Sequence, residues 1–456
     1  MLVPVNIPRR YWLAALVTIG LALVAALVGM QPALGVRHLV IACGGVACFA
    51  TIWIPQRLFR PAALGLLLLT LAIGVRRVEF RGLFIHPSEV VVCALLVICL
   101  LRRALRHERQ ALGQLGLVPA LFFASLPLGF VVAITQGVAP ALYVERIKTM
   151  CDGLLLLILL PALLDRERWP RQVSLALGGV SVLIALIAVT EAIFPVAVGA
   201  LFGAQASAEL LVANGFQRVP FTFWGGPHAT FILLLALPWL LLLLGEAHTP
   251  QQRFAAYVAV CLVVSVCLLG GYRGVWLGLG CMLGGALLLG RVGALPLLAL
   301  PAVGILLLQP QGFLARLGAL GLGAARDSSV VDRVNRLLLA WYIARDHPLI
   351  GGGWGAPGSA HSDLLQLAAE VGFGFAALFV FWVLSLLWRS IALARSGPSA
   401  LRPAARASAL SLIASLPLLA VEGLLYLPYV AVAFWLIMAC ARLLTVQPRP
   451  EASSSG

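Results

Sequence analysis

The sequence has very few charged residues: they make up 11% of its 456 positions, while 62% of the residues are hydrophobic. A water-soluble domain needs more charge than this, so the composition excludes a soluble globular protein. The long apolar runs are continuous and do not alternate with polar residues, which also excludes a membrane-spanning β-barrel. At about 20 residues per span the chain has room for roughly a dozen helices, too many for a single-pass receptor.

Lysine is almost absent, since Lys148 is the single lysine among 32 basic residues, and the net charge is +15. Nearly all the cations are therefore arginines, whose planar guanidinium suits phosphate groups. Cytoplasmic loops of membrane proteins also carry such cations, so only arginines outside those loops are informative. We expect membrane lipids as the surroundings of the chain and no nucleic-acid partner.

Paired cysteine motifs are missing too. The nine cysteines lie in or beside apolar segments, and the sequence contains no CxxC pair and no cysteine–histidine cluster with ligand spacing. We interpret these residues as small apolar packing side chains, which excludes a disulfide framework and a zinc site of the usual kind.

The apolar runs predict an all-α polytopic integral membrane protein with roughly 12 to 14 transmembrane helices. Arginine-rich segments recur on one side of the alternating spans, and the positive-inside rule assigns that side to the cytoplasm. The predicted organisation is N-terminal transmembrane helices in 1–196, a periplasmic loop in 197–227, transmembrane helices in 228–309, a large periplasmic loop with a surface helix in 310–361, C-terminal transmembrane helices in 362–444 and a disordered tail in 445–456.

The large outer loop contains the segment DSSVVDRVNRLLLAWYIARDHP, 327–348, which predicts a helix. Capping residues stand at Asp327 to Ser329, apolar residues recur at helical spacing, and Pro348 ends the pattern. Such a helix lies along the membrane surface or covers a cavity.

A glycine-rich loop after this helix leads to His361, at the mouth of the next span. Imidazole is the side chain whose ordinary pKa suits proton abstraction near neutral pH, although a histidine here can equally cap a helix at the interface. Gly353 belongs to the loop, which turns the backbone or approaches a ligand closely. Glu370 lies out of phase with His361 inside the span, and burying its charge costs about 2.5 to 3.5 kcal/mol, so we expect it to face the interior beside an arginine or a hydroxyl.

Four arginines lie in the outer segments around His361. Arg218 stands before one span, Arg273 interrupts an apolar stretch, and Arg333 and Arg336 belong to the surface helix. Contact with lipid headgroups explains any one of them. Together they predict a site for a phosphorylated, lipid-linked ligand carrying a diphosphate.

The order of these motifs resembles that of the O-antigen ligase and O-antigen polymerase superfamily of bacterial envelope glycosyltransferases. The matching segments are Arg218 with FTFWGGPHA, Arg273 with Gly274, Arg333 and Trp341 with DHPLIGGGWG, and finally HSDLLQLAAEVG. The close resemblance covers about residues 197–380.

The sequence departs from the family pattern at two positions. Pro227-His228 stands where the family has Pro-Asn, and Tyr272 stands where it has serine before the arginine. The first departure leaves two roles open for His228, which either contacts substrate or only begins a helix.

The resemblance implies a GT-C-like enzyme of the bacterial inner membrane that works on the periplasmic face. A ligase of this family transfers O-antigen polysaccharide from undecaprenyl pyrophosphate to the lipid A-core oligosaccharide, with inversion at the anomeric carbon. The implied roles are general base for His361, binding of the pyrophosphate for Arg218, Arg273, Arg333 and Arg336, and support of the site for Glu370, Trp341 and Gly353.

No cofactor is expected, and no metal either, because the outer segments contain no D-x-D motif. An O-antigen polymerase or a protein O-oligosaccharyltransferase remains an alternative, since these enzymes differ from the ligase in acceptor rather than donor. A transporter of polyisoprenoid-linked sugars is a further alternative. Against it stand the lack of internal repeats and the concentration of polar residues in the outer loops.

Overall fold

The structure is a computed structural model. It describes residues 54–73, 78–80, 83–106, 115–165, 167–194, 212, 213, 216, 217, 228–290, 299, 301, 303, 304, 307 and 328–446. Residues 1–53 of the predicted N-terminal transmembrane region, Arg218, and residues 447–456 of the predicted tail lie outside the described residues.

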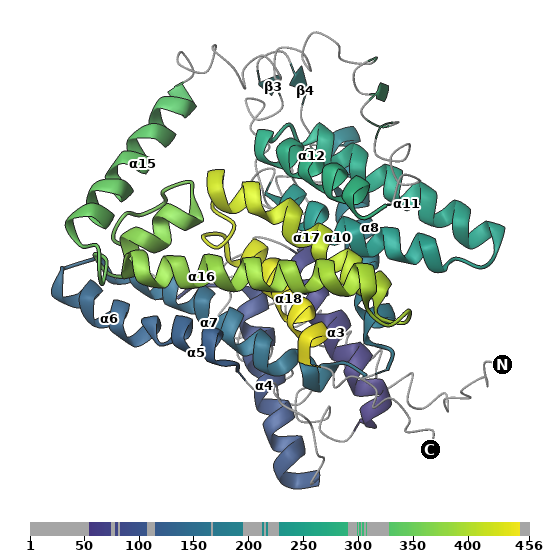
Figure 1. The fold of residues 1–456 in the computed structure, drawn as a ribbon, viewed down its shortest axis with the longest axis horizontal. Helices are drawn as coiled ribbons and strands as arrows, with labels where there is room; N and C mark the ends of the chain where they lie inside the picture. Colours follow the sequence, from purple (N-terminus) through teal and green to yellow (C-terminus); the bar gives the residue numbers. More distant parts are fainter. Residues whose placement is uncertain are drawn as a thin grey trace.

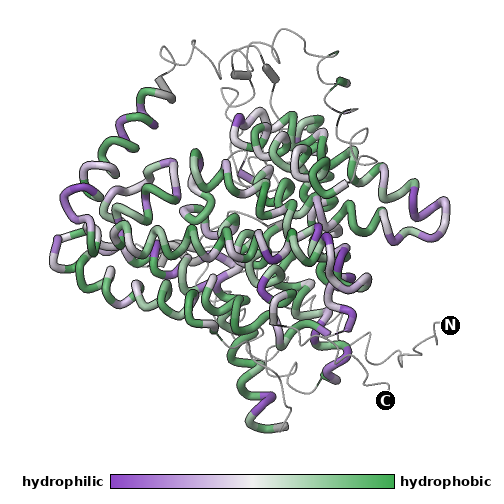
Figure 2. Tube along the Cα trace, viewed as in Figure 1, coloured by the Kyte–Doolittle hydropathy of each residue, from purple (hydrophilic) through white to green (hydrophobic). Residues whose placement is uncertain are grey.

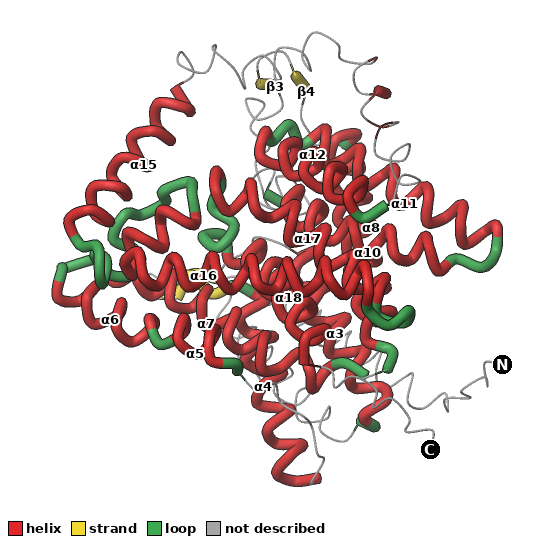
Figure 3. The backbone as a smooth tube through the Cα atoms, in the orientation of Figure 1, coloured by secondary structure: helices red, strands yellow, loops and turns green. Residues whose placement is uncertain are grey.

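The described residues form helices almost throughout (Figures 1 and 3). The helices are α3 (Gln56–Ile73), α4 (Pro87–Arg106), α5 (Leu117–Phe123), α6 (Ser125–Thr135), α7 (Pro140–Leu163), α8 (Trp169–Ile193), α10 (Ala229–Glu246), α11 (Pro250–Leu269), α12 (Arg273–Leu288), α15 (Ser328–Asp346), α16 (Asp363–Ser396), α17 (Arg402–Val421) and α18 (Pro428–Val446). Two short antiparallel hairpins pair β1 (Val78–Phe80) with β2 (Leu83–Ile85) and β3 (Val212–Ala213) with β4 (Phe216–Gln217).

Seven helical segments among the described residues are long and apolar enough to cross a membrane: α5 together with α6, α8, α10, α11, α16, α17 and α18. Helix α12 is apolar as well but shorter, with 16 residues. Hydrophobic residues run along the helices, while hydrophilic residues gather at ends such as that of α4 and the turn between α10 and α11 (Figure 2). The chain is therefore a polytopic helical membrane protein.

The centre of the bundle lies around α10 and α18, the spans with the largest buried shares. An aromatic cluster joins α18 to its neighbours: the Trp435 ring centroid lies 6.1 Å from that of Phe379 and 6.0 Å from that of Trp382, both on α16. Helix α7 approaches the same tryptophan through Gly153, where any side chain would collide with the indole ring. Close packing of this kind fixes the helices that carry the site.

Helix α16 is interrupted at Gly372, whose φ of 87° is not helical. The segment is long and apolar enough to cross a membrane, and its apolar pattern does not indicate this break. A side chain at residue 372 would collide with the Leu349 carbonyl, and the next amide, that of Phe373, donates to the Pro348 carbonyl at 2.9 Å. Glycine tolerates this conformation because it has no Cβ. The break gives the first segment of α16, which follows His361, its own direction.

Candidate functional site

A cavity of about 400 Å³ lies where the ends of several helices meet. Its walls include His228, Tyr272, Arg333, Arg336, His361 and Glu422. The starts of α10, α12, α16 and α18 and the end of α17 surround it, together with α15. The alternation of predicted spans assigns these helix ends to one side of the membrane, and in the structure they lie together.

His361 reaches the cavity from an unusual backbone conformation. It has a φ of 52°, the single positive value for a non-glycine residue among the described residues. Residues held in this region are uncommon and concentrate at functional sites. Its neighbours are fixed from α16: Gln366 Oε1 accepts from the Ala360 amide at 2.9 Å, and the Ser362 hydroxyl caps the helix by accepting from the Leu365 amide. The residues before and after His361 are therefore both held by hydrogen bonds, which fixes the backbone that carries the imidazole.

The protonation state of His361 follows from its surroundings. Partial burial lowers the pKa of His361 below the ordinary value of 6.5, and the guanidinium groups of Arg333 and Arg336 lower it further. A nearby carboxylate, Asp332, acts in the opposite direction. The ring is therefore neutral near pH 7 and able to accept a proton.

Two of the four predicted arginines line the cavity with His361. Arg333 donates to Glu422 Oε1 at 3.1 Å, in an ion pair where Arg333 is 34% exposed and Glu422 6%. Arg336 pairs with Asp332 at 2.8 Å, with both side chains about half exposed. The second pair is solvent-screened and weak, so Arg336 is easily available to a ligand.

The other two predicted arginines are not among the described residues that line the cavity. Arg273 is the first residue of α12, directly after the wall residue Tyr272, so it begins at the edge of the cavity. Arg218 lies outside the described residues. The site therefore gathers residues from separate motifs, with the placement of Arg218 still a prediction.

His228 precedes the first residue of α10, and it also lines the cavity. Its Nε2 lies 3.3 Å from the Tyr272 hydroxyl, and the two residues are those that depart from the family pattern. Burial lowers the pKa of His228 to about 4, with smaller contributions from His361 and Arg333. The ring is thus uncharged at neutral pH and adds no cation to the cavity.

Glu370 lies outside the cavity in a buried network. Both of its oxygens accept from Arg146 on α7 at 2.9 Å, and Oε1 also accepts from the Gly355 amide and Gln366 Nε2. Arg146 in turn donates to the Leu425 carbonyl, and the Leu425 amide donates to Asp363. The expected pairing of Glu370 with an arginine is confirmed. The network ties the glycine-rich loop to the connection between α17 and α18, which carries Glu422.

Gly353 and Trp341 also lie away from the cavity walls. Gly353 has a φ of 91° and packs against the backbone of Ala133 on α6, with no room for a side chain. Trp341 is 46% exposed on α15, and its ring contacts that of Phe373 at 6.1 Å. These residues hold the loop and α15 against the bundle and do not line the cavity.

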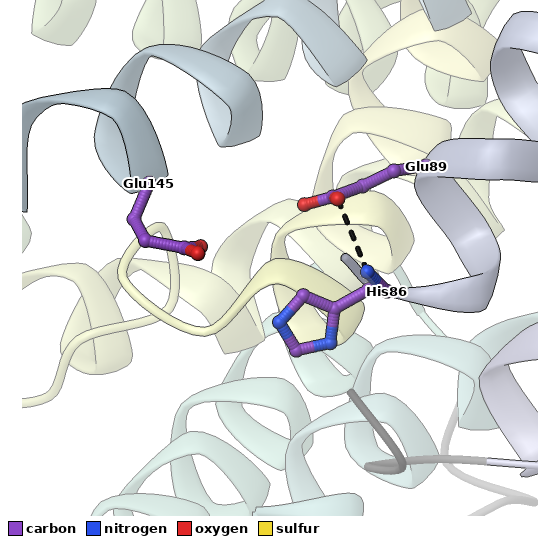
Figure 4. Close-up of side chains that lie close together, drawn as sticks. All are labelled: His86, Glu89 and Glu145. Atoms are coloured by element: carbon purple, nitrogen blue, oxygen red, sulfur yellow. Dashed lines mark hydrogen bonds between the residues drawn. The ribbon is translucent and has the colours of Figure 1, made fainter. Parts of the chain in front are cut away.

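A second polar cluster joins the start of α4 to α7 (Figure 4). The ligand atoms of His86, Glu89 and Glu145 lie within 4.8 Å of one another, so the group could hold a metal ion. The Lys148 ammonium, however, donates to Glu89 at 3.1 Å and to Glu145 at 3.3 Å. A metal ion would compete with this cation, and the cluster is explained as an ion-paired contact between helices.

Sequence reasoning did not find Glu422, Gln366 or Arg146. Glu422 belongs to the predicted C-terminal transmembrane region, 362–444, whereas α17 ends at Val421 and Glu422 lies just outside the helix. Gln366 and Arg146 carry a weak signal, since each is a polar residue in or beside an apolar span.

Compared with models of known protein families and with curated proteins, the chain matches none. The fold and the cavity therefore define a class, a polytopic helical membrane protein with a basic, histidine-containing site.

Proposed function

We propose that the protein is a lipopolysaccharide O-antigen ligase, a glycosyltransferase that moves O-antigen polysaccharide from undecaprenyl pyrophosphate to the lipid A-core oligosaccharide. The observation that supports this proposal is the meeting of His361, Arg333 and Arg336 in one cavity. Three residues predicted from the motifs for two chemical tasks, proton abstraction and diphosphate binding, stand where they can act together.

In the proposed reaction, Arg333 and Arg336 bind the diphosphate, with Arg273 and Arg218 as further contacts. Neutral His361 removes the proton from a hydroxyl of the acceptor sugar. The hydroxyl oxygen then attacks the anomeric carbon, the bond from that carbon to the phosphate oxygen breaks, and the configuration inverts. The arginines stabilise the negative charge that develops on the departing diphosphate, an effect worth about 2.7 to 4 kcal/mol per well-placed donor.

We propose an architecture and a location together with this function. It comprises roughly 12 to 14 spans in a GT-C-like arrangement, residence in the bacterial inner membrane, and a cavity that faces the periplasm. Support comes from the position of the cavity at the ends of the helices, because transporters instead bind substrate near the membrane midplane.

Lipopolysaccharide from a strain that lacks the gene tests the proposal on a gel. We expect core-only lipopolysaccharide together with accumulated lipid-linked polymer, because the polymer is made but not transferred. The wild-type gene should restore the ladder. Core carrying a single repeat unit would indicate a polymerase, an unchanged ladder with under-glycosylated proteins a protein oligosaccharyltransferase, and a loss of both ladder and periplasmic polymer a transporter.

We also expect transfer by the purified protein to continue in excess chelator. Divalent metals prefer several oxygen ligands, and Glu422 is the one carboxylate among the described residues that line the cavity. The arginines take the charge-stabilising role. Initial rates with and without chelator should agree within about twofold, and a complete loss restored by Mg²⁺ would contradict the metal-independent mechanism.

A further inference from the structure

Glu422 is an acidic residue in an otherwise basic site. Its carboxylate lies 3.1 Å from Arg333, one of the arginines proposed to bind the diphosphate, and it is nearly fully buried while Arg333 remains partly exposed. A ligand that enters the cavity therefore meets a guanidinium that is already paired with an anion. Glu422 accepts from Nη1 of this guanidinium, and an anion that binds its other N–H groups is repelled by the carboxylate beside it.

The Glu422 side chain is also held from a second direction. It packs on the first turn of α12, where a Cβ added to Gly274 would lie 2.9 Å from Glu422 Cγ and 3.2 Å from Oε1. A residue larger than glycine at position 274 would push the carboxylate aside. The Arg273-Gly274 turn thus provides the space in which Glu422 reaches Arg333.

We propose that Glu422 is an internal competitor for the diphosphate, occupying Arg333 until an anionic ligand displaces it and so setting the affinity for the lipid-linked donor. This inference rests on the proposed function. It assigns Glu422 a role in the specificity and regulation of the site and no part in bond making. Only a ligand anionic enough to outcompete a carboxylate for Arg333 then binds well.

Displacement has a consequence for protons. The charged and titratable groups that line the cavity with Glu422 are Arg333, Arg336, His228, His361, Tyr272 and Tyr426. Burial raises the pKa of Glu422, and the pairing with Arg333 opposes that rise. When Arg333 turns to the ligand, the opposing effect is lost, so the pKa of Glu422 rises further and proton uptake by this carboxylate is favoured. Ligand binding therefore weakens as pH rises, relative to a protein without this carboxylate.

A positioning role for Glu422 is a distinct hypothesis, and it predicts the opposite change in affinity. If Glu422 served to hold Arg333 in position for the ligand, its removal would weaken binding. The direction of the change in affinity therefore decides between competition and positioning, and Glu422→Gln is the suitable variant because it keeps the shape of the side chain and removes its charge.

The experiment measures binding of inorganic pyrophosphate to the purified full-length protein in lipid nanodiscs by titration calorimetry. We expect Glu422→Gln to lower the Kd roughly tenfold or more, at the low end of the coupling seen between close charge pairs. The ratio of wild-type to variant Kd should grow as pH rises through the pKa of Glu422, which burial places above its ordinary value. In an Arg333→Ala background the same change should give no gain, since the competition is for Arg333.

Asp346→Asn is the matched control, because it removes one negative charge from an exposed pair on α15 that does not line this cavity. It should leave the Kd within about twofold. An unchanged or higher Kd for Glu422→Gln, in a protein that keeps its unfolding temperature, would overturn the inference while leaving the proposed function intact. No pyrophosphate binding by either protein would instead count against the proposed function itself and leave the competitor with no ligand to exclude.

Discussion

His361→Ala is expected to slow glycosyl transfer by about 10² to 10⁴-fold, the range that a positioned general base contributes. The histidine lines the cavity with Arg333 and Arg336, is held by the backbone on both sides, and has a pKa lowered by burial and by the two guanidinium groups. The measurement is the initial rate of transfer from a lipid diphosphate-linked oligosaccharide by purified protein. The Km for the donor should change much less than kcat, because the base acts in the chemical step.

His347→Ala provides the control, since His347 lies at the end of α15 in the same connection but does not line this cavity. Its rate should match that of the wild type. The wild-type kcat/KM should fall as pH decreases through the pKa of His361, with the midpoint below 6.5 because the folded protein lowers that pKa. A His361→Ala variant that keeps half of the wild-type rate would rule out the proposed base.

Arg146→Met is expected to lower the free energy of unfolding by about 3 to 5 kcal/mol, because it leaves a buried carboxylate without its partner. Arg146 and Glu370 are 3% and 0% exposed, and their two hydrogen bonds of 2.9 Å form a bidentate pair between α7 and α16. Denaturant-induced unfolding in detergent micelles measures the effect. Transfer should fall as well, because the same network holds the glycine-rich loop that leads to His361, through the Gly355 amide and Gln366.

Arg345→Met is the matched control for this prediction. It breaks a pair of similar length, 3.0 Å to Asp346, in which both side chains are more than half exposed. Its effect should stay below about 1 kcal/mol, since solvent screens the charges. Adding Glu370→Met to Arg146→Met should recover part of the loss, because the unpaired charge is removed. A single Arg146→Met variant as stable as the control would contradict the role of the pair.

Much of the site was predictable because its residues carry local patterns. The helix over 327–348 was predicted from capping residues and apolar periodicity, and the structure forms α15 over Ser328–Asp346. His361 is indicated by the glycine-rich loop before it and by an imidazole suited to proton abstraction, and Arg333 and Arg336 are indicated by their place in an outer segment. These signals depend only on neighbouring residues in the sequence, so they can be recognised without a structure.

The contacts between distant segments were not predictable in the same way. Arg146 and Glu370 are separated by 224 positions, and Arg333 and Glu422 by 89, so no local spacing relates them. The break of α16 at Gly372 was missed as well, because the apolar pattern continues across it and only the contact with the Leu349 carbonyl requires the glycine. Tertiary packing determines these contacts, and the hydrophobic periodicity of a sequence carries no information about which distant segments pack together.

The most direct test of the account is transfer by the purified protein reconstituted in liposomes, with a synthetic lipid diphosphate-linked oligosaccharide as donor and lipid A-core as acceptor. We expect a covalent product whose new glycosidic bond is inverted relative to the donor, formed in the presence of chelator and lost with His361→Ala. Movement of the intact lipid-linked donor across the bilayer with no product would contradict the account and make the protein a transporter.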